Sequence, residues 1–310
     1  MTNCASREGE HKMDLKTAKE MFLAKHDCSD ERIDSFNEHV DEWIASLPQE
    51  IVPLVLSMIS SFDYYSHREA NKMLSRLHDE LGRDFGLSDN TALHTYIKKK
   101  GGRICSSVDY WQEYKSINKI DKNLCSDDLR EIPEREWALI ENIVIIDDCC
   151  GTGGSLEKFI KLSKRDFSGK TIYYLVLHAL EAAKERITKV EEKYNLCIHL
   201  VSINTRKLAT QIVSPDNAED IRGQLFTASK KMFIDEDYIL GKDNSEGLMA
   251  FYNNTPNNTN GLFWCPSDRN NPIFPRDFGT TPPWRPSINT MQKSKDQRKK
   301  DNYVAVKNRG

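Results

Sequence analysis

The chain has 310 residues, with 44 Lys and Arg against 47 Asp and Glu, so its formal net charge at pH 7 is −3. This length allows two domains or one large one, with a core that needs no disulfide staples. The near balance of charge argues against a protein that coats DNA with its whole surface. No apolar run approaches the roughly 18 to 20 residues that cross a bilayer, and the N-terminal residues lack the apolar core of a signal peptide. We therefore expect a cytoplasmic protein that makes no contact with a membrane.

The positive charge is concentrated near the C-terminus. Residues 288–310 contain seven Lys and Arg and two Asp, a charge of +5, so residues 1–287 carry −8. We interpret 288–310 as a separate basic tail. Such a tail is either a solvated terminus or a contact for nucleic acid or for an acidic partner surface.

The eight cysteines do not have the spacing of a metal site. The sequence contains no CxxC pair and no paired Cys and His ligand spacing. A zinc site and a disulfide framework are therefore not expected. We expect the cysteines, including Cys149 and Cys150, to pack as small apolar side chains.

The first hundred residues carry helical patterns. Apolar residues recur at spacings of three and four from Ile33 to Leu47, which predicts an amphipathic helix. Ser66 and Glu69 have the spacing of a capping box at the start of another helix. The stretch 49–62 is apolar on most sides and predicts a buried helix. We interpret 1–100 as a helical N-terminal region whose role is packing.

After residue 102 the pattern changes to alternating strands and helices. The β-branched run 143–146 is typical of a central parallel strand. Further strands are predicted at 170–177, 197–203 and 247–252, with helices at 155–165, 181–194 and 217–233. The predicted fold class is α/β with a mainly parallel sheet, in a domain that spans 101–287.

The end of this domain, residues 253–287, is rich in proline and asparagine. Seven of the eleven prolines and seven asparagines fall in it, a composition that excludes regular elements. The segment also contains five Phe and Trp residues, too many for a disordered linker. We expect an ordered loop packed onto the α/β domain.

One short motif indicates chemistry. The predicted strand 143–146 runs into Asp147 and Asp148, and a glycine-rich turn follows, made of Gly151, Thr152, Gly153, Gly154 and Ser155. A ligand of a parallel sheet binds beyond the carboxyl ends of the strands. Backbone amides of such a turn, at the start of a helix, bind a phosphate. Two acids cannot face that phosphate and suit ribose hydroxyls or a hydrated Mg²⁺.

The motif resembles the phosphoribosyl-diphosphate signature of type I phosphoribosyltransferases. In that family an apolar strand, two acids, two small apolar residues and a glycine turn bind phosphoribosyl diphosphate. The resemblance implies that Asp147 and Asp148 hold the ribose 2′ and 3′ hydroxyls and orient the sugar for catalysis. It also implies that residues 151–155 cradle the 5′-phosphate. If Asp147 and Asp148 bind Mg²⁺, we expect them to hold it through water.

A second resemblance extends along the chain. The stretches 254–264 (NTPNNTNGLFW) and 272–276 (PIFPR) resemble the C-terminal pattern of phosphoribosyltransferase-like proteins from bacterial conflict and anti-phage systems. Members are found near ATPases, and some accompany retron reverse transcriptases. The resemblance therefore implies a part in antiviral defence, as a component of a complex with an ATPase or a reverse transcriptase and its nucleic acid. Within this segment Asn257, Asn258 and Thr259 either cap the sugar or base or serve as turn formers.

Two departures from the family leave the activity open. Purine-salvage members have an acid that contacts the base where this chain has Gly151, and the usual diphosphate-binding loop is not recognisable. Lys98–Arg103 has suitable cations but is also typical of a solvated helix end. One hypothesis is an enzyme that transfers or cleaves at the ribose C1 carbon. The other is a non-catalytic module that senses a nucleotide or binds an ATPase partner.

A methyltransferase is the main alternative class. The stretch 148–154 also resembles the D-x-x-G-x-G-G turn of DNA adenine methyltransferases that use S-adenosylmethionine. That family prefers an apolar residue where Asp147 stands and needs an Asn-Pro-Pro-aromatic string, which is missing. We also considered His178, at the end of the strand 170–177, either as a ligand contact or as an interior histidine.

Overall fold

The structure is a computed structural model, and it describes residues 13–26, 30–98, 106–232 and 234–276. The predicted basic tail 288–310 and the part of the Lys98–Arg103 stretch beyond Lys98 lie outside the described residues. Among the helices that are described, none is by itself long and apolar enough to cross a membrane.

A four-stranded parallel sheet forms the centre of the α/β part. Its strands are β2 (Ala92–Tyr96), β3 (Asn142–Cys150), β4 (Thr171–Leu180) and β5 (Cys197–Arg206), in the order β2-β3-β4-β5. Neighbouring strands are parallel, with Ile143 beside Ile172 and Ile172 beside Ile198. The predicted α/β class with a parallel sheet is confirmed.

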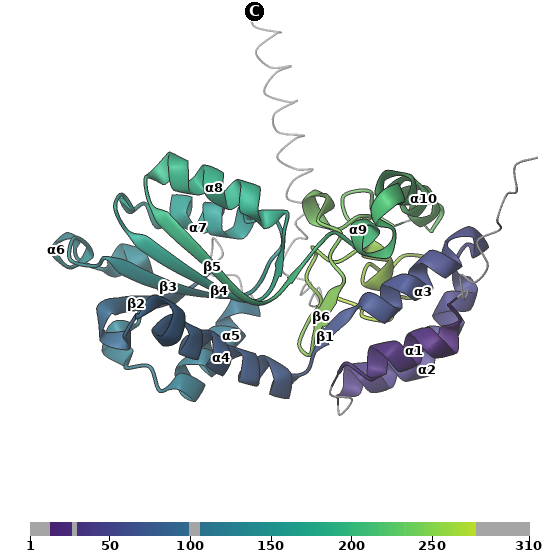
Figure 1. Cartoon of the computed structure of the whole chain (residues 1–310), viewed down its shortest axis with the longest axis horizontal. Helices are drawn as coiled ribbons and strands as arrows, with labels where there is room; N and C mark the ends of the chain where they lie inside the picture. Colours follow the sequence, from purple (N-terminus) through teal and green to yellow (C-terminus); the bar gives the residue numbers. More distant parts are fainter. Residues whose placement is uncertain (1–12, 27–29, 99–105, 233, 277–310) are drawn as a thin grey trace, which may run out of the picture. The chain divides into compact units, whose positions relative to one another are not determined.

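Helices cover both faces of this sheet, as Figure 1 shows. Helices α4 (His67–Phe85) and α5 (Ser106–Asn118) lie on one face, and α7 (Gly154–Ser163) and α8 (Ala183–Tyr194) lie on the other. Side chains of a strand alternate between the faces. Val144 and Ile146 therefore pack toward the first pair of helices, and Ile143 and Ile145 toward the second. The short helix α6 (Glu134–Trp137) precedes β3.

A second core is built from helices. It joins α1 (Leu15–Leu23), α2 (Glu31–Ser46), α3 (Val52–Ser61), α9 (Ala209–Val213) and α10 (Ala218–Lys231). The predicted amphipathic helix is α2 and the predicted buried helix is α3, so both are confirmed. The capping box at the start of α4 is also confirmed, because the Ser66 hydroxyl accepts from the Glu69 amide and the Glu69 carboxylate accepts from the Ser66 amide.

The described residues of the stretch 1–100 include two strands, which the helical interpretation missed. β2 opens the main sheet, and β1 (Asp63–Tyr65) pairs in parallel with β6 (Met249–Phe251) in a separate two-stranded sheet. The strand predicted at 247–252 therefore exists, but it lies outside the main sheet. A strand of three residues is too short to show a periodicity, and periodicity does not specify the partner of a strand.

Several single turns of 3-10 helix complete the described elements: Gln49–Ile51, Asp89–Thr91, Lys122–Leu124, Leu129–Glu131, Pro215–Asn217, Lys242–Asn244 and Gly261–Phe263.

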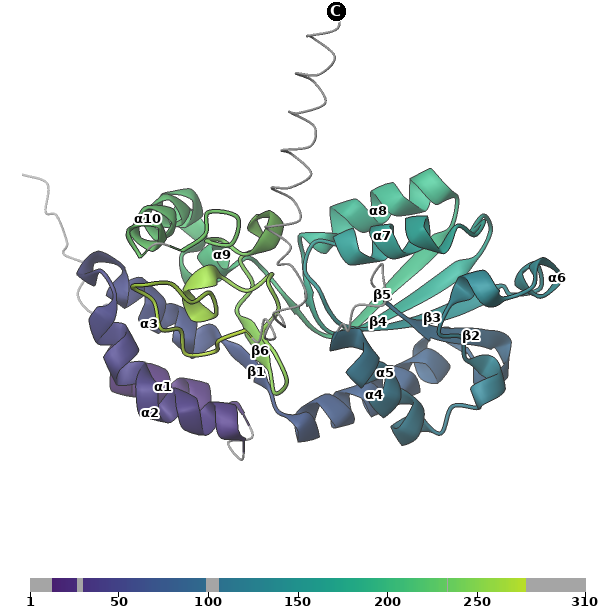
Figure 2. The same cartoon turned by 180° about the vertical axis from the view of Figure 1, so that it is seen from behind.

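The proline- and asparagine-rich segment is ordered up to Arg276, where the described residues end. Its aromatic side chains Phe263, Trp264 and Phe274 are buried, and they join the core of α1, α2 and α3. Figure 2 shows this segment beside those helices. The Phe274 ring thus packs on the helical core, against Phe22, Phe36 and Phe62. The polar part of the segment contacts the α/β part as expected, since Asn253 bonds to α5 and Asn258 lies against Gly151.

Arg32 on α2 ties this segment to the two-stranded sheet. Its guanidinium donates to the Phe251 carbonyl on β6, to the Thr255 hydroxyl at 2.8 Å and to the Pro275 carbonyl at 2.9 Å. The guanidinium also lies over the Phe274 ring. Hydrogen bonds from a charged donor are stronger than neutral ones, so Arg32 fixes both ends of the stretch 255–275.

Arg32→Met should therefore lower the free energy of unfolding by roughly 2–4 kcal/mol, because three acceptors lose a charged donor. Urea titration followed by circular dichroism measures this change. Arg135→Met is the matched control, since the Arg135 side chain is 87% exposed. An equal and small effect of both substitutions would contradict the anchoring role of Arg32.

Candidate functional site

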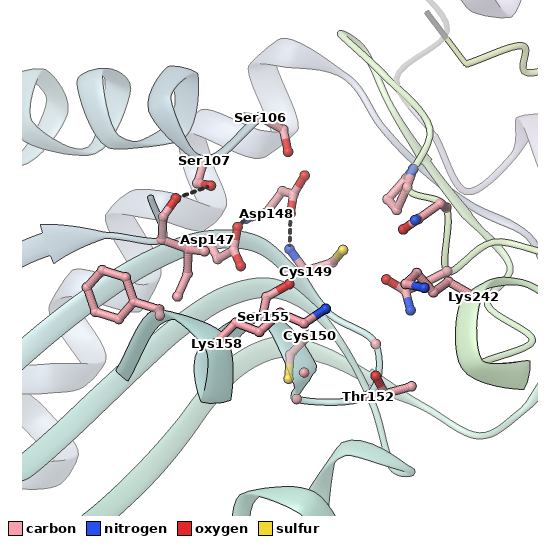
Figure 3. A pocket seen from close by; sticks show the side chains of 18 of the residues that line it. Ser106, Ser107, Asp147, Asp148, Cys149, Cys150, Thr152, Ser155, Lys158 and Lys242 are labelled. Atoms are coloured by element: carbon pink, nitrogen blue, oxygen red, sulfur yellow. Dashed lines mark hydrogen bonds between the residues drawn. The ribbon is translucent and has the colours of Figure 1, made fainter. Parts of the chain in front are cut away.

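The predicted acid pair lies within strand β3, not in the turn after it. β3 continues past Ile146 to Cys150, and it pairs along this extension with β4. Asp147 and Asp148 therefore have a fixed backbone. Both line a cavity of about 360 Å³ at the carboxyl end of β3, within the size range of ligand pockets. Figure 3 shows the two carboxylates beside the start of helix α7.

The two acids have different environments. The Asp147 side chain is buried; its Oδ2 accepts from the Tyr174 hydroxyl at 2.8 Å and its Oδ1 from the Asp148 amide at 3.1 Å. Burial, helped by the neighbouring charge of Asp148, raises the pKa of Asp147 well above its ordinary value. The protonated form of Asp147 is therefore favoured.

Asp148 is the acid of the pair that remains for a ligand. It is half-buried, and its Oδ1 accepts from the Cys149 amide at 2.7 Å. The second carboxylate oxygen can accept from a sugar hydroxyl or from water on a cation. The structure thus brings both predicted acids to the pocket and distinguishes them by burial.

The predicted phosphate loop follows β3 in the chain and lines the same cavity. Gly153 has a φ of +74°, a conformation that favours glycine, and α7 begins at Gly154. The first amides of α7 lack partners within the helix, and the helix dipole places positive charge there. Ser155 adds an exposed hydroxyl to this end of the pocket. These are the features that bind a phosphate.

Lys158 is a functional candidate that our sequence reasoning missed. It lies on α7 and lines the pocket next to the loop. Figure 3 shows it beside Ser155. A residue three positions after Ser155 lies on the same face of the helix, so its spacing from the glycine turn was an available signal.

The opposite wall of the pocket comes from the end of the described chain. It consists of 254–258, Lys242, Asp243 and Arg276. Asn257 and Asn258 are therefore brought to the pocket as one of our interpretations expected. Thr259 is not: it is buried, and its hydroxyl donates to the Met249 carbonyl at 2.6 Å. Two of these three neighbouring residues thus line the cavity, and the third is buried away from it.

Four cations from the described residues line the pocket, and they differ in their partners. Lys98 at the end of β2 lies 3.3 Å from Asp128, and Lys242 lies 3.7 Å from Asp243. Within the described part of the chain, Lys158 and Arg276 form no ion pair with a carboxylate. Burial lowers the pKa of Arg276, an effect that the charge of Asp148 opposes, and an arginine remains protonated. Together these cations suit a ligand with more than one anionic group.

Two further candidates are structural. His178 is buried outside the pocket, and its Nδ1 lies 2.7 Å from the Tyr65 hydroxyl. Burial lowers the pKa of His178 to about 4, so its ring is neutral at pH 7. Cys149 and Cys150 line the pocket, but burial raises the pKa of both thiols, that of Cys150 to about 12. Since the thiolate is the nucleophile, their packing role is the better interpretation.

The donors present fit Mg²⁺ only as a hydrated ion. Among the described residues no three His, Cys, Asp or Glu side chains gather in a way that could hold a metal. Both oxygens of Asp147 accept hydrogen bonds from the protein. The Asp148 carboxylate is half-buried and accepts from the Cys149 amide through Oδ1, and Mg²⁺ commonly binds through one carboxylate, water and ligand phosphates.

The parallel α/β fold, with an acid pair and a glycine loop at the carboxyl end of a central strand, defines a phosphoribosyltransferase-like protein. Comparison with family models supports this class, since residues 40–276 match the PRTase-CE family. The chain belongs to that family. No curated protein and no solved structure matches the chain.

Asp147→Asn tests the buried acid. A carboxyl whose pKa is raised by folding stabilises the fold fully below its unfolded pKa, and this contribution is lost as the pH rises through the folded pKa. The asparagine side chain cannot ionise. We expect the substitution to raise the melting temperature by a few degrees at pH 8 relative to the wild type, with the difference disappearing near pH 4.

Differential scanning calorimetry between pH 4 and pH 8 measures this, with the exposed Asp216→Asn as control. A destabilisation by Asp147→Asn that grows with pH would show that the buried carboxyl is ionised.

Proposed function

We propose that the chain binds phosphoribosyl diphosphate, or a nucleotide derived from it, with Mg²⁺, and that it acts at the ribose C1 carbon. The observation that carries this proposal is the convergence of Asp148, the phosphate loop and Lys158 on one cavity. The phosphate would lie on the amides at the start of α7, with the hydroxyl of Ser155 beside it. The sugar would lie over the end of β3, where Asp148 accepts from a ribose hydroxyl.

This arrangement supports chemistry that builds positive charge on the sugar. Departure of a group from C1 leaves an oxocarbenium-like centre, which a nearby carboxylate stabilises. Asp148 would take this role, because Asp147 is held by Tyr174. Mg²⁺, when bound through water at Asp148, would neutralise charge on the ligand phosphates. Lys158 and Arg276 would hold the remaining phosphate charge.

A binding module without catalysis is the second candidate, and two observations favour it. Residue 151 has no side chain to serve as an acid or base, and the Asn258 amide occupies the space above it. Asp147 favours its neutral form. A pocket of this kind can retain a nucleotide and report its presence to a partner without breaking a bond.

The family resemblance of the sequence supports a wider context for either activity. We extend the proposal to a component of a bacterial anti-phage system, of which a retron is one kind, with an ATPase or a reverse transcriptase complex as partner. The charge of +5 on residues 288–310 supports contact between that tail and nucleic acid.

Binding of phosphoribosyl diphosphate with Mg²⁺ tests the site. Asp148→Asn should weaken binding by about 10- to 100-fold, because a charged acceptor of a sugar hydroxyl or of a hydrated cation is lost. Isothermal titration calorimetry measures the affinity, with Asp216→Asn as the matched control outside the pocket. Equal affinity of Asp148→Asn and the wild type would refute the site. Binding of S-adenosylmethionine in its place would support the methyltransferase alternative.

Nucleotide pools in bacteria separate the enzyme from the sensor. If the chain is an enzyme, induction of the wild type should deplete one or more nucleotides by several-fold, whereas the Asp148→Asn variant at equal abundance should leave them unchanged. Mass spectrometry of cell extracts measures these pools, with and without phage infection as the trigger. Unchanged pools under both conditions, together with tight binding in vitro, would favour the sensor.

A further inference from the structure

Gly151 and Asn258 form a matched pair across the pocket. They are distant in the chain, yet a Cβ atom at residue 151 would lie 2.3 Å from both the Cγ and the Nδ2 of Asn258 and 2.8 Å from its Oδ1. Real Cβ atoms essentially never lie within 3.0 Å of another heavy atom, so a side chain at residue 151 would require the Asn258 amide to shift. The Asn258 amide therefore occupies the space that any side chain at residue 151 would need.

The position of Asn258 is held by its backbone. Its carbonyl accepts from the Gly247 amide at 2.8 Å and from the Ser245 hydroxyl at 2.9 Å. A Cβ at Gly241 would lie 2.4 Å from this carbonyl oxygen, and one at Gly247 would lie 2.9 Å from it. Glycines on three sides thus leave room for Asn258, while the two hydrogen bonds to its carbonyl fix its place.

The side chain of Asn258 retains hydrogen-bonding capacity. Its Nδ2 donates to the Ser245 hydroxyl at 3.1 Å, which leaves one N–H. Its Oδ1 has no hydrogen-bond partner among the described residues and is not buried. A free carbonyl oxygen and a free N–H on one amide complement a neutral edge that carries a donor beside an acceptor, as in a nucleobase or a carboxamide.

The walls of the pocket determine which part of a ligand Asn258 can contact. Strand β3 and helix α7 would hold the sugar and its 5′-phosphate on one side, while 254–258 and Arg276 form the other side. The part of the ligand that the first wall leaves free is the group on the ribose C1 carbon. Asn258 lies over Gly151, the residue that joins the end of β3 to the rest of the phosphate loop.

We propose that Asn258 is the specificity-determining residue of this pocket, and that it binds a neutral amide-like or nucleobase edge on the ribose C1 carbon. The glycine at residue 151 is then a requirement of that contact, because any side chain there would displace the amide. This inference rests on the proposed function for the identity of the ligand, but the pairing of the two residues does not.

The pairing is tested without a ligand. Gly151→Ala should lower the melting temperature by the cost of moving the Asn258 amide, and this loss should disappear when Asn258→Gly is also present, because the second substitution opens the space. Gly223→Ala is the matched control, since a Cβ there meets nothing. Equal effects of Gly151→Ala in both backgrounds would overturn the pairing.

The contact is tested by comparing ribose 5-phosphate, which has no base, with the four nucleoside 5′-monophosphates in calorimetry. Asn258→Ala should weaken the best-bound monophosphate by about tenfold or more and ribose 5-phosphate by less than about threefold. Asn258→Asp fills the same space but carries no donor, and it should lose the same discrimination. Asn217→Ala, an amide outside the pocket, is the control.

The outcomes separate the two proposals. A wild type that binds the monophosphates while both Asn258 variants keep its discrimination overturns the role of Asn258 alone. If the wild type binds neither class of ligand and does not bind phosphoribosyl diphosphate, the proposed function is overturned, and with it the contact to the group on C1. The melting-temperature comparison still tests the pairing of Gly151 and Asn258 in that case.

Discussion

The guanidinium of Arg32 connects three stretches of chain on which the second wall of the pocket depends. It donates from α2 to Phe251 on β6 and to Thr255 and Pro275 in the segment that lines the cavity. Burial of a guanidinium is costly unless its N–H groups find acceptors, and here the acceptors are the ends of that segment. A helix that contributes no residue to the pocket thus holds Thr255 and Pro275, which lie near Asn258 and Arg276 in the chain.

Within the pocket, Asp147 and Asp148 are adjacent on one strand but differ in burial. Burial raises the pKa of Asp147, which reduces the repulsion between the two carboxylates. Asp147 packs against Tyr174 and favours its protonated form, while Asp148 is only half-buried and lines the cavity. Two ionised carboxylates beside a phosphate loop would oppose the binding of an anion. With one acid neutral, the pocket holds one carboxylate, that of Asp148, together with Lys158, Arg276 and the start of α7.

The fold was largely predictable where the local pattern is long. Helix α2 shows its apolar face over several turns, and β3 shows a continuous β-branched run, so both were predicted correctly. Strand β1 has three residues, and β6 pairs with β1 instead of the main sheet. The existence of β1 could not be predicted, because three residues show no periodicity. The pairing of β6 with β1 could not be predicted either, because the pattern of a strand does not specify its partner strand. The same limit applies to the aromatic residues of 253–276, whose burial was expected but whose partners on α1, α2 and α3 were not.

By itself, the sequence determined the parallel α/β class, the acid pair at the end of a central strand and the glycine loop after it, because each is encoded in consecutive residues. Only the tertiary structure decided that the buried Asp147 carboxylate packs against Tyr174, that Arg276 lines the pocket, and that Asn258 covers Gly151. These contacts join residues that are distant in the chain, and their geometry is set by packing between elements. The net charge of −3 likewise gave no indication that four cations line one pocket, because these cations come from four separate segments of the chain.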